Sequence, residues 1–436
     1  MKIKADTFAT FNVSIASEKL KRIDFKIVQG DQTDMEGQNA FAIDDLYLTD
    51  SSPTPFIPPA SDAVFLQWLK RASLRYFQYN FKYNGSNKGV VVESFTDQKK
   101  VSLSGLGYAY AAFLIMKNDG VISSAEAKEK IAAMLNWQYA QNWFDGSAGI
   151  HGFPYHYFNL DGSGLSKDAS TIDWAMCAAG LRVVRQHYQN DTQIVTMINE
   201  LLARPDWNTA IDTSNKIVMG FDGNTGSANN YRWGLSFSEE TELVYLEAVA
   251  CGDLKSRHFG SIVRKKKNGF YPSWFGAGFT YNWLQLWTGA REPYKTNSVL
   301  AFQTDYNAGQ AAFGKPIMGL TACLTVTDMD ENGFLRWTRY VSNQGSTVHG
   351  TNINSEVIQV SPATYGAVLA LPFNSSLAMA SLRELVSLGF YHPYIGLPDN
   401  IRLKELPGEM TPPANWDTFD INIGPQALAI EMVQKI

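Results

Sequence analysis

The stretch GLGYAYAAFLIM, residues 105–116, is apolar on every side of the helix that it predicts. Two later stretches share this property, IDWAMCAAGL at 172–181 and ALAIEMV at 427–433. A helix without a polar face is buried on all sides. These segments therefore predict the inner helices of a large helical domain.

Helical periodicity continues on both sides of these segments, starting with DAVFLQWLKRASLRYFQYNF at 62–81. Further helices are expected at about 102–117, 123–142, 170–189, 192–204, 238–251, 296–310, 316–324, 361–371, 375–389 and 421–435. We predict a mainly α fold, an (α/α)6 toroid in which buried inner helices alternate with amphipathic outer ones. A helical solenoid is the alternative, but the sequence shows no fixed-period repeat. In the toroid, a ligand would bind at the concave end formed by the N-termini of the inner helices.

The N-terminal part of the chain has a different pattern. Residues 1–50 alternate apolar and polar side chains, which predicts a small β-structured segment. It either packs on the main domain or belongs to a larger β-sandwich module. SSPTPFIPPAS at 51–61 is a Pro/Ser linker, and residues 62–436 form the helical domain.

Composition excludes several classes of protein. The net charge is −5, which argues against nucleic acid as a partner. No apolar run reaches the ~18 residues that a membrane span needs. The three cysteines are far apart, and no His/Asp/Cys spacing or Gly-rich phosphate loop appears, so we expect no metal and no cofactor. We also expect a monomer.

The chain is rich in aromatic residues, with 11 Trp, 20 Tyr and 25 Phe among many Asn and Gly. Sugar rings pair apolar C–H faces with a rim of hydroxyls, so aromatic side chains beside polar ones suit them. Eight aromatic residues lie within NGFYPSWFGAGFTYNWLQLWTG, 268–289, although a core role is a reasonable alternative for about half of them. The predicted sugar-stacking residues are Trp174, Tyr231, Trp233, Tyr271, Trp274, Tyr281, Trp283 and Trp287.

Cleavage of a glycosidic bond needs two carboxyl groups, one protonated and one ionised. In YRWGLSFSEETELVYLEA, 231–248, Ser236 and Glu239 have the spacing of a capping box, which would explain Glu239. Glu240 lies one turn before Leu243 and Val244, so it faces the buried side of the helix. First-turn amides lower a carboxyl pKa, so a neighbouring carboxylate or an apolar pocket must raise it in a general acid.

Two further stretches carry acidic residues next to apolar helices. In KDASTIDWAMCAAGL, 167–181, Asp168 is a plausible N-cap, whereas Asp173 lies within the apolar part and is a candidate for catalysis. In NWDTFDINIGPQALAIEMV, 415–433, Asp417 and Asp420 precede a Gly-Pro helix start, and Glu431 lies deep within the helix.

These motifs resemble the glycoamylase-like family of (α/α)6 enzymes, which includes bacterial endo-β-1,2-glucanases and glucoamylase-like proteins. The resemblance covers residues from about 62 to 436 in the family's order. It is carried by GLGYAYAA (105–112), STIDWAMCAAG (170–180), FSEETELVYLEAV (237–249), GFTYNWLQLW (278–287), MGLTACL (318–324) and INIGPQALAIEM (421–432).

The resemblance implies roles for particular residues. It matches Asp173 to the acid of the family's Ser-Thr-Ile-Asp motif and Asp168 to the acid before it. If the family's aromatic-Ser-Glu motif is matched directly, its general acid corresponds to Glu239. If positions are counted back from Tyr245, the general acid corresponds to Glu240. Two family histidines become Tyr281 and Gln285, and a C-terminal family Asp becomes Asn422, so Asp420 is the candidate replacement base.

We therefore predict a glycoside hydrolase of glucan-type poly- or oligosaccharides. The catalytic candidates are Glu240, Glu239, Asp173 and Asp420, with Asp168, Gln285 and Asn422 as further substrate-binding residues. The resemblance implies a bacterial protein of the periplasm or the secreted fraction. The alternatives are a non-catalytic glycan-binding protein on the same scaffold, suggested by the missing histidines and Asp, and a polysaccharide lyase, which an acidic, His-poor site disfavours.

Overall fold

A computed structural model describes the chain from residue 58 to residue 434. Gaps fall at 84, 86–87, 95–97, 253, 268, 274–275, 320, 322, 330–334, 342–344, 348–349, 353–364, 389–390, 392–395 and 400–419. Internal contacts divide the chain into Met1–Pro58 and Pro59–Ile436, and every element below belongs to the second unit. The predicted β segment 1–50 and most of the linker lie outside the described residues.

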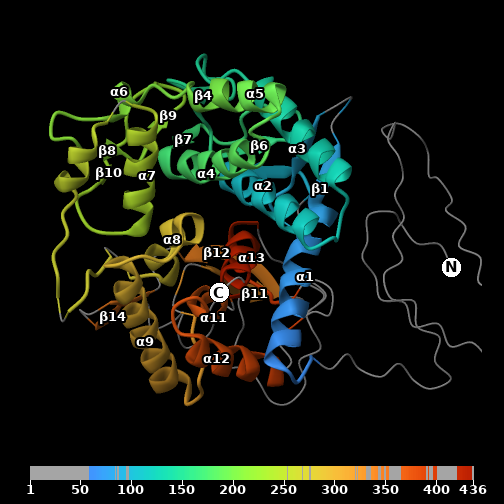
Figure 1. Cartoon of the computed structure of the whole chain (residues 1–436). Coiled ribbons are helices and arrows are strands. Elements are labelled where there is room, and N and C mark those ends of the chain that lie inside the picture. Colours follow the sequence, from blue (N-terminus) through green and yellow to red (C-terminus); the bar gives the residue numbers. More distant parts are fainter. Residues whose placement is uncertain are drawn as a thin grey trace, which may run out of the picture. The chain divides into compact units, whose positions relative to one another are not determined.

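Helices dominate this second unit (Figure 1). They are α1 (Asp62–Asn80), α2 (Leu103–Asn118), α3 (Ser124–Tyr139), α4 (Thr171–His187), α5 (Thr192–Leu202), α6 (Trp207–Ala210), α7 (Glu239–Ala250), α8 (Trp283–Thr288), α9 (Tyr294–Phe313), α11 (Tyr365–Ala370), α12 (Ser375–Ser387) and α13 (Asp420–Gln434), with 3-10 turns η2 (Ser256–Ser261) and η3 (Gly278–Tyr281). Most predicted helices are confirmed. The one expected at 316–324 is wrong, because strand β11 begins at Cys323, and α8 and α6 were not predicted.

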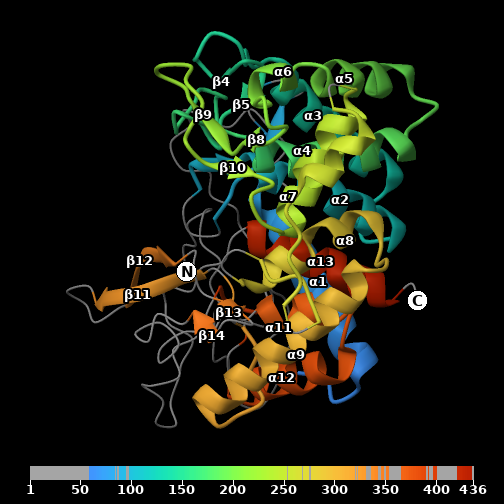
Figure 2. The same cartoon turned by 90° about the vertical axis from the view of Figure 1, so that its left-hand side faces the viewer.

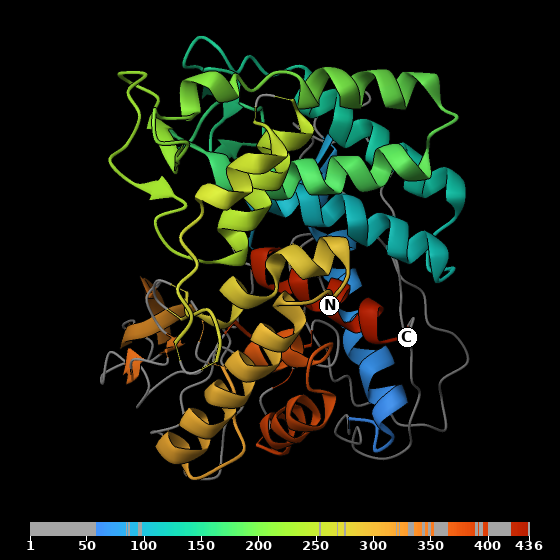
Figure 3. The same cartoon turned by 60° about the vertical axis from the view of Figure 1, so that its left-hand side comes forward.

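The apolar helices form the inner ring. In chain order α2 packs on α4, α4 on α7, and α7 on α8, while η3 links α8 to α11. α11 packs on α13, which lies beside both α8 and α2 and so closes the ring (Figure 3). Outside it, α1, α3, α5, α9 and α12 cover their inner neighbours, and η2 packs on α7. The unit is therefore mainly α with the predicted (α/α)6 arrangement.

Two glycines allow α2 and α4 to approach each other closely. A Cβ added to Gly107 would lie 2.4 Å from the backbone oxygen of Met176, and one added to Gly180 would lie 2.3 Å from that of Gly107. Atoms at these distances overlap, so each position needs a residue without a Cβ. The glycines in GLGYAYAA and AMCAAG thus set the distance between two inner helices.

The strands form antiparallel pairs: β1 (Phe81–Tyr83) with β2 (Gly89–Val91), β3 (Lys100–Ser102) with β6 (Tyr157–Asn159), β4 (Gly149–Ile150) with β5 (Phe153–Pro154), β7 (Asp168–Ser170) with β9 (Gly220–Asp222), β8 (Ile217–Val218) with β10 (Arg232–Trp233), β11 (Cys323–Met329) with β12 (Leu335–Val341), and β13 (Gly345–Thr347) with β14 (Gly350–Asn352). Figure 2 shows most of them gathered at one side of the helices. β3, β7 and β10 lead into α2, α4 and α7, so this side holds the N-termini of those inner helices.

The C-terminal helix differs from its prediction at two points. α13 begins at Asp420, and Pro425 lies inside it rather than at its start. Glu431, which the sequence left unexplained, forms an ion pair with Lys70 of α1 at 2.5 Å, and Lys70 also contacts Asp119 at 2.6 Å. This buried ion pair gives Glu431 a structural role. Among the described residues, no helix is long and apolar enough to cross a bilayer.

Candidate active site

The candidate site starts at the N-terminus of α7. Ser238 is the N-cap, and its hydroxyl accepts a hydrogen bond of 3.1 Å from the backbone N–H of Thr241. The helix therefore begins at Glu239, and the predicted capping box from Ser236 is wrong. The hydroxyl of an N-cap serine accepts the hydrogen bond of the backbone N–H three positions later, so the cap needs no carboxylate.

Glu239 turns away from the cap and toward α8. It accepts hydrogen bonds from the backbone N–H of Gln285, at 3.2 Å, and from the Gln285 side-chain amide. Burial raises the pKa of Glu239 to about 8, although the bonds from Gln285 act in the opposite direction. Both oxygens are engaged, so Glu239 joins α7 to α8.

Glu240 is buried, as its helical phase predicts, with 7% of its surface exposed. Its Oε2 atom is inaccessible and has no hydrogen-bond partner within the described part of the chain. Burial, followed by the negative charge of Asp173, raises the pKa of Glu240 to about 8. The carboxyl is therefore protonated at neutral pH and lies close enough to Asp173 to be affected by its charge.

Asp173 lies in the first turn of α4, where its backbone N–H bonds the hydroxyl of Ser170 at 3.3 Å. Ser170 is the N-cap, so the prediction of Asp168 as N-cap is wrong. Asp168 lies in β7 opposite Asp222, and burial is the main cause of its raised pKa. The charges of Asp173 and Asp222 add to this rise, and that of His156 opposes it.

His156 belongs to the same cluster, although no motif in the sequence pointed to it. Its Nε2 atom lies 3.5 Å from Oδ1 of Asp173, and its backbone N–H donates to the oxygen of Asp168 at 2.8 Å. The ring stacks on Tyr157 with centroids 3.9 Å apart. No motif spacing marks His156, because it reaches the start of α4 only through the pairing of Tyr155 and His156 with β7.

The chain between β8 and α7 is tied to the start of α4. The indole N–H of Trp233 donates to the hydroxyl of Thr171 at 2.9 Å, and that hydroxyl donates to the oxygen of Val218. Two residues earlier, the backbone oxygen of Tyr231 accepts from Met219, whose own oxygen accepts from the N–H of Thr171. Trp233 is therefore buried and links these segments, whereas Tyr231, whose backbone is connected to the start of α4 through Met219, is 70% exposed.

The structure removes most other aromatic candidates from this site. Trp174 is fully buried against Trp143, and Tyr281 and Trp283 are buried as well. Tyr271 is half-buried and packs with Phe237 and Tyr281. Gln285 is fully buried on Glu239 and Ser298. Burial excludes sugar stacking by Trp174, Tyr281 and Trp283, whereas Trp287 is half-buried and stacks on Tyr108 of α2.

Some predicted residues lie outside the described part of the chain. Trp274 is one of them, and the side chains of Asp420 and Asn422 are not described, although both residues belong to α13. Their roles remain predictions. Within the described residues, no group of three or more His, Cys, Asp or Glu side chains could hold a metal ion.

The arrangement can support acid catalysis. Glu240 supplies a carboxyl that keeps its proton at neutral pH, and Asp173 supplies a second carboxyl group with a histidine beside it. In many enzymes, one of two neighbouring carboxyl groups acts as the acid and the other as the base because their environments shift their pKa values apart.

No family model and no curated protein matches the sequence. The structure is similar to a "putative glucoamylase" from Bacteroides uniformis ATCC 8492, with 16% identity, a TM-score of 0.67, and coverage of 86% of this chain and 92% of the other. It is also similar to the endo-β-1,2-glucanase of Chitinophaga pinensis in complex with sophorotriose and glucose, with 14% identity, a TM-score of 0.63, and coverage of 86% and 93%.

A D-mannose isomerase is similar as well, with 10% identity, a TM-score of 0.53, and coverage of 87% of this chain and 99% of the other. At these identities the similarity concerns the fold alone, and the same fold accompanies different reactions. The chain has the (α/α)6 fold shared by glucoamylase-like proteins and endo-β-1,2-glucanases, which confirms the resemblance at that level.

Proposed function

We propose that this protein is a glycoside hydrolase that cleaves a glucan-type poly- or oligosaccharide by acid catalysis from Glu240. The carboxyl of Glu240 donates its proton to the leaving glycosidic oxygen. Asp173, held by Ser170 and accompanied by His156, orients the attacking water or stabilises positive charge at the sugar. Asp420 is the candidate base, on the resemblance alone.

One observation supports this proposal above the others. Oε2 of Glu240 is a buried carboxyl oxygen without a hydrogen-bond partner in the described residues, and it belongs to a group affected by the charge of a second acid. Burying an unsatisfied polar atom destabilises a protein, so its presence favours a functional role for the group. We expect substrate binding to bring a glycosidic oxygen to the Glu240 carboxyl, since the residue is 7% exposed.

The same observation favours a hydrolase over a glycan-binding protein and over a lyase. A non-catalytic glycan-binding protein has no need of a protonated carboxyl without a partner. A lyase needs a base and a cation near a uronate, whereas the cluster holds Glu240, Asp173 and Asp168 with His156 as its one basic member among the residues described here. Hydrolysis of a neutral glucan is favoured over both.

The proposal is tested by incubating the full chain with a panel of α- and β-linked glucans and measuring new reducing ends. We expect release of reducing sugar from at least one glucan. Binding without product would support the glycan-binding alternative, and unsaturated products absorbing in the ultraviolet would support the lyase. Conversion of one free sugar into another, without hydrolysis, would place the protein with the isomerases.

The pKa of Glu240 predicts the pH dependence of activity. A general acid works only while protonated, so the alkaline limb of kcat/KM should begin at about pH 8 and fall about tenfold per pH unit above it. Because the charge of Asp173 contributes to the raised pKa, Asp173→Asn should move the alkaline limb to lower pH. A limb that stays in place in Asp173→Asn would contradict this assignment.

Stability should follow the same titrations. The folded-state pKa of Glu239 and Glu240 lies above the ordinary value of 4.5, so the folded protein binds more protons than the unfolded chain between about pH 4.5 and 8. The free energy of unfolding should therefore decrease as the pH rises through this range. Urea unfolding at several pH values measures the slope, and Glu240→Gln should reduce it.

Tyr231 is exposed and its backbone is connected to the start of α4, and we expect its ring to bind a sugar. Tyr231→Ala should raise KM about two- to tenfold with kcat unchanged, since an aromatic contact contributes about 0.5–1.5 kcal/mol to substrate and transition state alike. Steady-state kinetics on the hydrolysed glucan measures both constants. The matched control is Tyr83→Ala, which removes an exposed tyrosine from β1 and should leave KM unchanged.

A further inference from the structure

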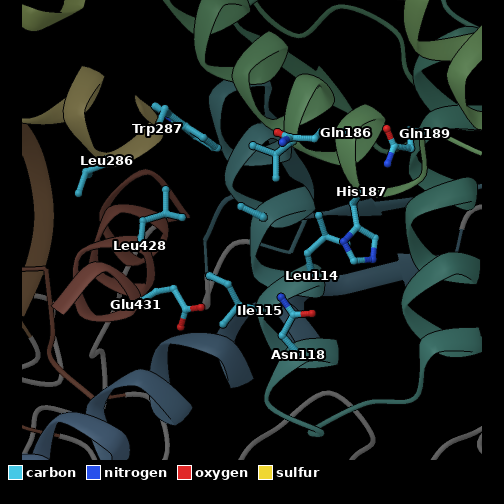
Figure 4. A pocket seen from close by; sticks show the side chains of 12 residues that line it. Leu114, Ile115, Asn118, Gln186, His187, Gln189, Leu286, Trp287, Leu428 and Glu431 are labelled. Carbon is cyan, nitrogen blue, oxygen red and sulfur yellow. The ribbon is translucent and has the colours of Figure 1, made fainter. Parts of the chain in front are cut away.

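A cavity of about 530 Å³ lies at the end of the ring opposite the catalytic cluster. We call it the distal cavity, and its walls are the last turns of α2, α4 and α8 with the C-terminal half of α13 (Figure 4). α4 contributes to both places, with Asp173 in its first turn and His187 at its end. Asp173 and His187 are 14 residues apart along α4, a distance of about 21 Å.

The floor of the distal cavity is apolar and includes one aromatic ring. Leu114, Ile115, Leu286 and Leu428 supply aliphatic surface, and Trp287 is half-buried among them. Trp287 stacks on Tyr108 with centroids 5.3 Å apart and an interplanar angle of 24°, which holds its ring in place. Its indole N–H is buried and has no acceptor within the described residues.

The rim consists of side-chain amides. Asn118 ends α2, and Gln186 and Gln189 come from the end of α4 and the residues after it. All three are exposed, and none of these amides is hydrogen-bonded within the part of the chain that the structure describes. Figure 4 shows the two glutamines and His187 along one wall, with Leu428 and Glu431 on the other.

The one carboxylate among the described lining residues lies in an ion pair, although its lysine partner also pairs with Asp119. Glu431 is paired with Lys70. Nε2 of His187 lies 3.0 Å from Nζ of Lys117, which as an ammonium can only donate, so the proton of the neutral ring lies on Nδ1. Burial and the charge of Lys117 both lower the pKa of His187. His187 therefore presents a neutral donor, and the cavity suits an uncharged ligand.

We propose that the distal cavity is a second carbohydrate site that binds the end of a neutral oligosaccharide. A sugar ring places its C–H face on Trp287 and the aliphatic floor, while its hydroxyls bond the amides, the indole N–H and His187. The volume falls within the ~300–1,000 Å³ of small-molecule sites. The choice of a sugar over other neutral ligands rests on the proposed function, whereas the site itself rests on its lining.

Trp287 provides a direct readout. The full chain is labelled with 5-fluorotryptophan, and Trp287→Phe assigns one of the fluorine resonances. Sophorose and maltose, a β-linked and an α-linked glucose disaccharide, are then titrated. We expect the Trp287 resonance to shift with at least one of them. Gln186→Ala/Gln189→Ala should raise the Kd at least about tenfold, equal to about 1.4 kcal/mol. Gln193→Ala, which changes an exposed glutamine of α5 that does not line the cavity, should leave the Kd unchanged.

A Trp287 resonance that moves with neither disaccharide overturns the inference, and so does an unchanged Kd in the double glutamine variant. Hydrolysis is measured on the same protein and separates the two proposals. Hydrolysis of a glucan without a Trp287 shift contradicts only the distal site. A Trp287 shift without hydrolysis of any glucan contradicts the proposed function and leaves the distal site standing.

Discussion

Replacing Glu240 by Gln should lower kcat on the hydrolysed glucan by about 10²–10⁴-fold, the contribution typical of a positioned general acid. The amide keeps the shape of the side chain but has no acidic proton for the leaving oxygen. KM should change little, because the proton is transferred only in the transition state. Initial rates across substrate concentrations measure both constants, and the alkaline limb above about pH 8 should vanish from the residual activity.

Glu239→Gln is the matched control, since it makes the same chemical change one residue away. Glu239 is bonded to Gln285 and has no free oxygen, so its loss should affect stability rather than chemistry. We expect kcat to remain within about tenfold of wild type and the free energy of unfolding to fall by about 1–3 kcal/mol. Loss of activity in Glu239→Gln with an active Glu240→Gln would reverse the assignment of the acid.

Glu240→Gln should also be more stable than wild type at pH 8. Wild type must either bury an ionised carboxyl at this pH or take up a proton to avoid it, whereas an amide does neither. Urea unfolding at pH 8 and at pH 5 measures the difference, and the gain should be larger at pH 8. A variant destabilised equally at both pH values would contradict the raised pKa of Glu240.

Replacing Lys70 by Met should lower the free energy of unfolding by about 3–5 kcal/mol, the usual effect of removing one partner from a buried ion pair. Lys70 is 3% exposed and contacts two carboxylates, Glu431 of α13 at 2.5 Å and Asp119 at the end of α2 at 2.6 Å. Without its ammonium group, Glu431 stays buried with an uncompensated charge. Thermal and urea unfolding measure the loss.

The Lys128→Met variant tests whether burial is the reason for the large loss of stability expected in Lys70→Met. Lys128 pairs with Asp191 at 2.7 Å, but its side chain is 53% exposed, so we expect a loss of only about 0–1 kcal/mol. Adding Glu431→Leu to Lys70→Met should recover part of the stability, because replacing both charges by apolar groups is less harmful than leaving one. Equal losses in Lys70→Met and Lys128→Met would show that burial is unimportant here.

The sequence predicted the helices best where periodicity and length agreed. α2, α4 and α13 were found from apolar runs, because a helix buried on all sides leaves a pattern that no loop shares. α8 was missed because six residues are too few to show a helical period, and the expected helix at 316–324 proved wrong because β11 begins within it. The role of Gly107 and Gly180 could not be predicted from the sequence, because it depends on the contact between α2 and α4.

For the site, the sequence by itself predicted that Glu240 is buried, since its position relative to Leu243 and Val244 follows from 3.6 residues per turn. It did not predict that Glu239 and Glu242 are buried as well. Only the tertiary structure decided the rest. It showed that Ser238 caps the helix, that Glu239 bonds Gln285, and that Asp173 and His156 lie together at the start of α4. The physical reason is that helical phase is local, whereas a hydrogen bond or a pKa depends on groups that the fold brings from distant parts of the chain.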